Sequence, residues 1–216
     1  IKDIIWSISK YGLLIPRIHF EGIDLGSNVE YCTGFSAKYI FNNCLGPGSK
    51  IRVVLSGDVI PYIAEVIEST YPLMPKVNYK WNESRIHIIS LEDGKTLSMK
   101  KTVHFIKTLK IDYLSTGIVN ILYENGFNTL KKIINITVQD LLKLHGFKET
   151  NSTKIYQSIN RIISKPISLS QLMVASLSFN HGMGKKRIDK ILEKYPNLME
   201  DKPSLEQIIS IDGFSD

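Results

Sequence analysis

Two short segments combine glycine with closely following lysine, a composition that suits contact with phosphate groups. One runs Gly146-Phe147-Lys148, and the other runs Gly182-Met183-Gly184-Lys185-Lys186. Glycine lets a turn approach a phosphate closely and adopt backbone angles that a Cβ forbids. Backbone N–H groups of the turn and of the next helix can then face one phosphate oxygen, and lysine adds charge. The pattern predicts phosphate contacts at Gly146, Lys148, Gly182, Gly184, Lys185 and Lys186.

These segments are members of a weak internal repeat of helix, turn and helix. The better copy starts at Phe179-Asn180-His181, a third segment runs from Ile111 to Gly117, and Ile209–Phe214 begins a fourth. Gly117 marks a degenerate copy, for which packing alone is the alternative role. A single copy would be read as a glycine that caps a helix in an ordinary bundle. Three or four copies, joined to a β-barrel, favour DNA binding.

The elements that must position these turns are short helices. From Lys100 onward, apolar residues recur at helical spacing, as in Val103, Ile106 and Leu109. Thr137 stands three residues before Asp140, which predicts a capping box. Asn125-Gly126 predicts the end of a helix. The second half is therefore expected to be all-α.

The first half has the pattern of short strands instead. Apolar and β-branched runs separated by glycine or proline predict strands near 4–8, 13–20, 28–33, 50–55 and 59–67, with a short helix capped by Ser36. This order suits a small five-stranded Greek-key barrel. A further hairpin is expected from 77–81 and 86–89, with its turn at 82–84. Residues 92–95 read as another turn.

With these elements in place, the chain resembles NAD-dependent DNA ligases. The barrel half is similar from Trp6 to Gly12, through Thr33-Gly34-Phe35-Ser36-Ala37, to the block Gly57-Asp58-Val59-Ile60-Pro61. The later repeats resemble the helix-hairpin-helix modules of DNA repair and ligation proteins. The likeness covers nearly the whole chain. It implies an α+β multidomain fold with a five-stranded OB-type β-barrel over 1–75, a linker hairpin over 76–99, and a tandem helix-hairpin-helix domain over 100–216 whose last hairpin is truncated.

The resemblance also implies which barrel residues contact DNA. In the family, the barrel lies on the minor groove at the nick. Lys10 stands where the family usually has arginine, and Val59 and Ile60 match apolar residues that press on the groove. Arg52 could compensate for Leu55, which replaces a basic residue. The alternatives are that Val59 and Ile60 belong to a plain core strand and that Lys10 is a solvated surface charge.

The resemblance further implies that parts of the enzyme lie elsewhere. Residues 76–99 contain no cysteine and one histidine, His87, so zinc is not expected where the family has a zinc finger. The family accepts AMP on a Lys-x-Asp-Gly lysine, and this chain has no such motif. We therefore expect no catalytic residue here. An adenylation domain, either upstream of Ile1 or a separate polypeptide, would bind the NAD and Mg²⁺ of the complete enzyme.

Composition sets the remaining expectations. The net charge of +6 and the pI of about 9.1 are compatible with a polyanionic partner. No apolar run is long enough for a membrane span, and Cys32 and Cys44 are expected to be free thiols. The expected partner is nicked duplex DNA, bound by a monomer inside the cell, in the cytoplasm, the nucleoid or a viral replication site. The Ile-, Lys- and Asn-rich, cysteine-poor composition suggests a viral or phage source.

Two other functions fit part of the same pattern. Holliday-junction-binding proteins also join a barrel to tandem hairpins, so a non-catalytic protein that binds branched DNA is the main alternative. Such a protein would start with its own methionine and form a tetramer. A structural two-domain protein with capped helices is the remaining possibility. The segments Ser9–Pro16 and Gly57–Pro61 favour the ligase interpretation.

Overall fold

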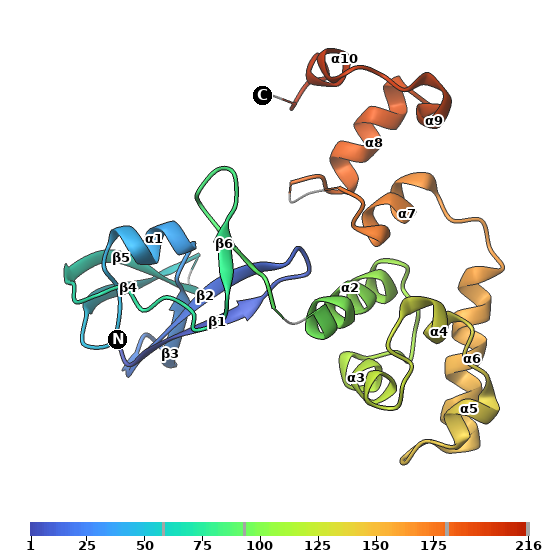
Figure 1. Cartoon of the computed structure of the whole chain (residues 1–216), viewed down its shortest axis with the longest axis horizontal. Helices are drawn as coiled ribbons and strands as arrows, with labels where there is room; N and C mark the ends of the chain where they lie inside the picture. Colours follow the sequence, from blue (N-terminus) through green and yellow to red (C-terminus); the bar gives the residue numbers. More distant parts are fainter. Residues whose placement is uncertain (58, 93, 180–181, 215–216) are drawn as a thin grey trace. The chain divides into compact units, whose positions relative to one another are not determined.

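The structure is a computed structural model that describes residues 1–57, 59–92, 94–179 and 182–214. It is an α+β fold with small antiparallel sheets. The chain divides into two compact units, Ile1–Leu97 and Ser98–Asp216 (Figure 1). Asp58, Asp93, Asn180 and His181, which the sequence analysis placed in motifs or turns, lie outside the described residues.

The first unit contains all of the strands in the described chain, and its longest strand has a clear two-residue period. In β2, Leu14, Pro16, Ile18 and Phe20 are buried, while the residues between them are half-buried or exposed. Alternation of this kind places one face of a strand on the core and the other toward solvent. The elements of this unit are β1 (Asp3–Ile8), β2 (Leu13–Asp24), β3 (Asn28–Thr33), α1 (Ala37–Asn42), β4 (Lys50–Ser56), β5 (Ile60–Glu68), β6 (Tyr79–Trp81) and β7 (Ile88–Ser90).

These strands form two antiparallel sheets that share a core. One sheet has the order β1-β2-β7-β6 with β3 also paired to β2, and the other is the hairpin β4–β5. The Ile1 amino group donates to Ser49 O at 2.7 Å, and Gly48 N donates to Ile1 O at 2.9 Å, so the chain start is bonded to the turn just before β4. Ile18 of the first sheet and Val53 and Ile63 of the second are buried in one cluster.

The hairpin β6–β7 is an integral part of the first sheet. The sequence predicted both of its strands, and they pair as expected, with Trp81 opposite Ile88. It was expected to act as a linker, but β7 also pairs with β2, with Ile88 opposite Leu14. Ile88 is fully buried, and this long-range contact fixes the hairpin on the sheet.

The second unit is helical. Its core contains Ile106, Val119, Leu122, Leu141 and Ile155, each at most 2% exposed. The predicted capping box is confirmed, because Thr137 Oγ1 accepts from Asp140 N at 3.1 Å. The helices are α2 (Gly94–Thr108), α3 (Thr116–Glu124), α4 (Leu130–Ile134), α5 (Val138–Leu142), α6 (Glu149–Ile163), α7 (Leu169–Ser176), α8 (Lys185–Lys194), α9 (Leu198–Asp201) and α10 (Leu205–Ile209).

One predicted turn is wrong. Residues 92–95 were expected to form a turn before a helix near Lys100, but α2 already includes Gly94 and Lys95. The first turn of α2 carries few apolar residues, so the hydrophobic period that reveals the helix starts only later in its sequence. The helix is therefore longer than its apolar stripe.

Candidate nucleic-acid interface

The turns that precede α3, α6 and α8 share one backbone feature. In each turn, the residue two positions before the N-cap has a positive φ: 64° at Tyr113, 84° at Gly146 and 106° at Gly182. The next residue is apolar, namely Leu114, Phe147 or Met183, and is buried or half-buried. Gly213 repeats the feature with φ 86° and is followed by half-buried Phe214. The weak sequence repeat is thus also a repeat of backbone shape.

The turn before α8 ends in an N-cap that has no capping side chain. Gly184 is the N-cap of α8, with φ −86° and no side-chain cap hydrogen bond. The first N–H groups of an α-helix have no partner within the helix and need an outside acceptor. A glycine N-cap has no side chain to provide one. The start of α8 is therefore suited to accept an anion.

Most other helices of the described chain supply their own acceptor. A serine or threonine hydroxyl accepts from the backbone at the N-caps Ser36, Ser115, Thr129, Thr137, Ser168 and Ser204. The N-caps of α6, α8 and the single-turn α9 have no such bond. Two of these three helices are the ones that follow the glycine turns predicted from the sequence.

Glycine occupies the two positions 182 and 184 before α8 for different structural reasons. Gly182 has φ 106°, a conformation that side chains rarely adopt, so the turn itself requires glycine there. Gly184 has an ordinary φ, and a Cβ built on it would meet nothing within 4 Å among the described residues. Among the described residues, nothing requires glycine at 184. A close approach by a ligand is a physical reason for it.

The basic residues after Gly184 have different surroundings. Lys185 Nζ lies 2.6 Å from Asp189 Oδ2, and this hydrogen bond is the main cause that lowers the pKa of the Asp189 carboxyl. Lys186 is exposed and forms no ion pair among the described residues. Arg187 Nη1 donates to Gly182 O at 3.3 Å, which braces the turn. This role of Arg187 was not predicted from the sequence, although its place in the basic run is a signal.

At the turn before α6, a side chain of the helix itself already accepts from one backbone N–H group. Gly146 has φ 84° and open space around it, and Lys148 is the N-cap of α6. The Lys148 N–H donates to Asn151 Oδ1 at 2.7 Å, so one donor is already used. The Lys148 side chain is exposed. This second predicted site therefore places the Lys148 charge beside the start of α6. Compared with the start of α8, one backbone N–H group fewer is left for a ligand.

The turn before α3 differs from both. Gly117 was expected to match the turn glycines, but it lies inside the first turn of α3, and Tyr113 occupies the equivalent positive-φ position. Ser115 Oγ accepts from Ile118 N at 3.3 Å. Asp112 pairs with Arg161 of α6. This turn is closed by its own side chains, which suits the packing role.

The predicted barrel residues lie in two turns and on the strands β4 and β5. Lys10 is in the β1–β2 turn, its Nζ lies 5.1 Å from the centroid of the Tyr11 ring, and partial burial lowers its pKa. Val59 and Ile60 are 76% and 63% exposed beside the β4–β5 turn, so they are not core residues. Arg52 lies on β4 and pairs across the hairpin with Glu65 at 3.1 Å. This partner competes with any phosphate for the Arg52 charge.

The predicted residues therefore fall into local groups. Gly182, Gly184, Lys185 and Lys186 gather at the start of α8, and Gly146 and Lys148 gather at the start of α6. Val59 and Ile60 form an exposed apolar pair within the first unit. Each group is local to one turn.

The described residues contain no cluster with metal-ligand composition. No group of three or more His, Cys, Asp or Glu side chains lies close enough to hold a metal ion within the described ranges. Cys32 and Cys44 are free, and burial raises the pKa of the Cys32 thiol to about 11, which keeps it protonated and unreactive near neutral pH. Among the described helices, none is long and apolar enough to cross a membrane.

Comparison with known proteins relates the chain to DNA ligases. It is 38% identical over 224 residues to "DNA ligase" of Acanthamoeba polyphaga mimivirus, covering 99% of this chain and 35% of that protein. It is 32% identical to "Putative DNA ligase 205R" of Invertebrate iridescent virus 6, covering 96% and 32%. Identity to "DNA ligase" of Desulfatibacillum aliphaticivorans is 27%, covering 100% and 35%. No family model matches the chain.

These relatives are longer than this chain, which spans about a third of their length. The matches nevertheless extend over nearly all of its own residues, in viral and bacterial proteins alike. The open start of α8, the glycine turn before α6 and the exposed apolar pair all lie within the matched length. Over nearly its entire length, this chain is a DNA ligase-related region.

Proposed function

We propose that this chain is the DNA-binding part of an NAD-dependent DNA ligase that seals nicks in duplex DNA. In this proposal, β1–β5 form an OB-type barrel at the nick, and the helices of the second unit form tandem helix-hairpin-helix motifs on the duplex backbone. The hairpin β6–β7 takes the place of the zinc finger. The source is proposed to be a virus or phage, in line with the viral relatives.

The observation that carries the proposal is the open start of α8. A positive-φ glycine, an apolar anchor and a glycine N-cap present N–H groups that no side chain of the described residues caps, next to exposed Lys186. A phosphate oxygen is the acceptor that this arrangement suits, because its charge complements both the helix N-terminus and the lysine. Contacts of this type hold a duplex in position and carry no sequence information.

The first unit supplies a different kind of contact. Val59 and Ile60 are exposed on a hairpin whose interior is formed by buried Val53 and Ile63. Exposed apolar side chains next to a turn suit contact with the sugars and base edges of a minor groove. Lys10, on another turn of this unit, is proposed to contact a phosphate near the nick.

In the complete enzyme, AMP passes to the 5′-phosphate at the nick, and the 3′-hydroxyl then displaces it. The residues of this chain hold the duplex and align the two ends, which contributes by positioning. NAD and Mg²⁺ are proposed to act at an adenylation domain, and no residue of this chain is proposed to react.

The first test is binding of the chain to three labelled DNAs across a salt series. A nicked duplex, an intact duplex and a four-way junction of equal length are compared by fluorescence anisotropy. The proposal expects tightest binding to the nicked duplex. It also expects log K to fall with log salt by about 0.9 for each phosphate neutralised.

The competing outcomes separate the functions considered from the sequence. Preference for the junction would support the branched-DNA alternative and reject nick recognition. Absence of binding to all three DNAs at about 50 mM salt would reject DNA binding itself.

A further inference from the structure

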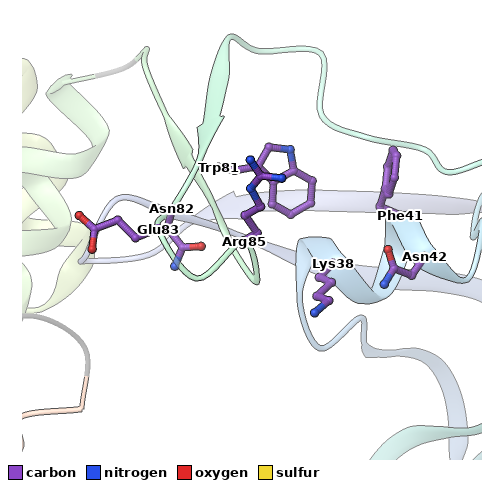
Figure 2. A pocket seen from close by; sticks show the side chains of 7 residues that line it. All are labelled: Lys38, Phe41, Asn42, Trp81, Asn82, Glu83 and Arg85. Carbon is purple, nitrogen blue, oxygen red and sulfur yellow. The ribbon is translucent and has the colours of Figure 1, made fainter. Parts of the chain in front are cut away.

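The first unit contains a pocket that no predicted DNA contact uses. It has a volume of about 870 Å³ and lies between α1 and the β6–β7 hairpin loop (Figure 2). Its lining consists of two aromatic rings, two basic side chains, two amides and one carboxylate, from Phe41, Trp81, Lys38, Arg85, Asn42, Asn82 and Glu83. Ligand pockets typically measure ~300–1,000 Å³, so this one is large enough for a ligand.

The walls of this pocket, named here the hairpin pocket, are held by hydrogen bonds. Asn82 Oδ1 accepts from Ile86 N at 3.2 Å and from His87 N at 3.1 Å, which closes the hairpin loop. Lys38 N donates to Ile86 O at 3.1 Å, which bonds α1 to that loop. Arg85 lies in this loop and has φ 52°, which is uncommon for a residue other than glycine. The pocket is therefore formed by bonded elements of the sheet unit.

The aromatic residues of the hairpin pocket form an open corner. The rings of Phe41 and Trp81 are 6.2 Å apart between centroids, with an angle of 80° between their planes. Phe41 is 52% exposed, so the core does not explain this large apolar side chain on α1. A planar ligand can stack on one ring of such a corner and meet the edge of the other.

The charged residues of the hairpin pocket favour an anionic ligand. Lys38 and Arg85 are exposed, and within the described chain neither forms an ion pair. Glu83 is the one carboxylate in the lining, so the pocket keeps a net positive charge. Aromatic rings next to unpaired cations are the elements with which proteins bind single-stranded nucleic acid, by base stacking and phosphate contact.

We propose that the hairpin pocket binds unpaired nucleotides of single-stranded DNA. A base lies in the corner formed by Phe41 and Trp81, the adjoining phosphates lie at Lys38 and Arg85, and the Asn42 amide faces the base edge. The choice of DNA as the polymer rests on the proposed function, since frayed or displaced strand ends occur at nicks. The pocket would hold such an end away from the duplex.

The test uses a labelled oligo(dT) of about eight nucleotides and the 216-residue chain. Phe41→Ala is expected to weaken oligo(dT) binding about tenfold, since the base would lose an aromatic ring on which it stacks. The double variant Lys38→Ala/Arg85→Ala should weaken it to a similar extent and reduce its salt dependence. Quenching of tryptophan fluorescence by oligo(dT) should disappear in Trp81→Phe, which leaves Trp6 as the remaining tryptophan.

Two exposed residues give matched controls. Tyr71→Ala removes an aromatic ring that is 61% exposed, and Lys80→Ala removes a charge from the β6 residue before Trp81. Neighbouring residues of a strand point to opposite faces, so Lys80 lies on the other face from Trp81. Both controls should bind oligo(dT) like the parent chain. Thermal melting followed by circular dichroism identifies any variant that is unfolded.

The outcomes separate this inference from the proposed function. If the parent chain binds nicked duplex but oligo(dT) binding is absent, or unchanged by the pocket variants, the inference is wrong and the proposed function stands. If neither DNA binds, both fail. Quenching of Trp81 by a peptide rich in Glu and Phe, without quenching by oligo(dT), would assign the pocket to a protein partner and overturn the inference.

Discussion

The starts of α3 and α8 have the same backbone conformation but differ in the side chain of the N-cap residue. Each follows a residue of positive φ, Tyr113 or Gly182, and an apolar anchor. At α3, the Ser115 hydroxyl accepts from the helix, whereas Gly184 at α8 has no side chain to do so. The same repeated turn can therefore have its helix N–H groups capped by its own side chain, or it can leave these N–H groups for a ligand. The N-cap decides between these two roles.

The largest expected effect comes from giving α8 an acceptor of its own. In Gly184→Asp, the new carboxylate would cap α8 and occupy the position proposed for a phosphate. Binding to nicked duplex should weaken by about 30-fold, equivalent to about 2 kcal/mol, the scale of a charged hydrogen bond. Thermal stability should stay the same or rise, because aspartate is a better N-cap than glycine. Anisotropy titration and thermal melting measure the two effects.

The matched control introduces the same charge at the closed turn. Ser115→Asp keeps a capping side chain on α3, and its effect on binding should stay below about twofold, as expected for an exposed charge away from the site. If Ser115→Asp weakened binding as much as Gly184→Asp, general repulsion would explain both results. The distinction between open and closed turns would then be lost.

The next effect concerns stability and compares the two predicted glycine sites. Gly146→Ser should lower the free energy of unfolding by about 1–2 kcal/mol, because φ 84° is strained for residues with a Cβ. Gly184→Ser should leave it unchanged or raise it by a few tenths of a kcal/mol. Urea unfolding should be followed by circular dichroism, since both tryptophans, Trp6 and Trp81, lie in the first unit. Equal losses would contradict the different reasons assigned to these glycines.

A smaller effect is expected at the apolar pair of the first unit. Ile60→Ser should weaken binding to nicked duplex about fivefold, because part of an apolar side chain would no longer be buried. The salt dependence should remain that of the parent chain, because no charge is removed. Ile67→Ser, at a residue of the same strand that is 59% exposed, should have no effect on binding. A change in salt slope for Ile60→Ser would indicate an indirect effect on the charged contacts.

The smallest effect separates two adjacent lysines. Lys186→Ala should weaken binding about threefold and reduce the salt slope by about 0.9, the value for one lost phosphate contact. Lys185→Ala should do less, because Asp189 already pairs with Lys185. Titrations at several salt concentrations compare the slopes. A larger loss for Lys185→Ala would show that its charge is free to reach DNA.

Local signals in the sequence predicted much of the secondary structure. The third strand matches β3 at 28–33, and the hydroxyls of Ser36 and Thr137 cap their helices as expected. These features depend on residues close together in the sequence, so a short pattern is enough to reveal them. The early start of α2 was missed because its first turn has no apolar stripe.

Features that depend on distant residues could not be predicted in this way. The pairing of Ile88 with Leu14 joins the β6–β7 hairpin to β2, and the pairing of Arg52 with Glu65 depends on the register of a hairpin. Gly117 was misaligned because Tyr113 adopts a positive φ, which is uncommon for a residue other than glycine. The hairpin pocket was missed for a similar reason, since α1 and the hairpin loop meet only in the folded unit.

The most direct test of the open-turn account is amide chemical shift mapping during titration with nicked duplex. The backbone N–H signals of Gly184, Lys185 and Lys186 should move most in the second unit, as expected when N–H groups donate to a phosphate. The signals of Thr116 and Gly117 in α3 should stay in place. Large shifts at Thr116 and Gly117, or none at the start of α8, would contradict the assignment of phosphate binding to the helix that lacks a side-chain cap.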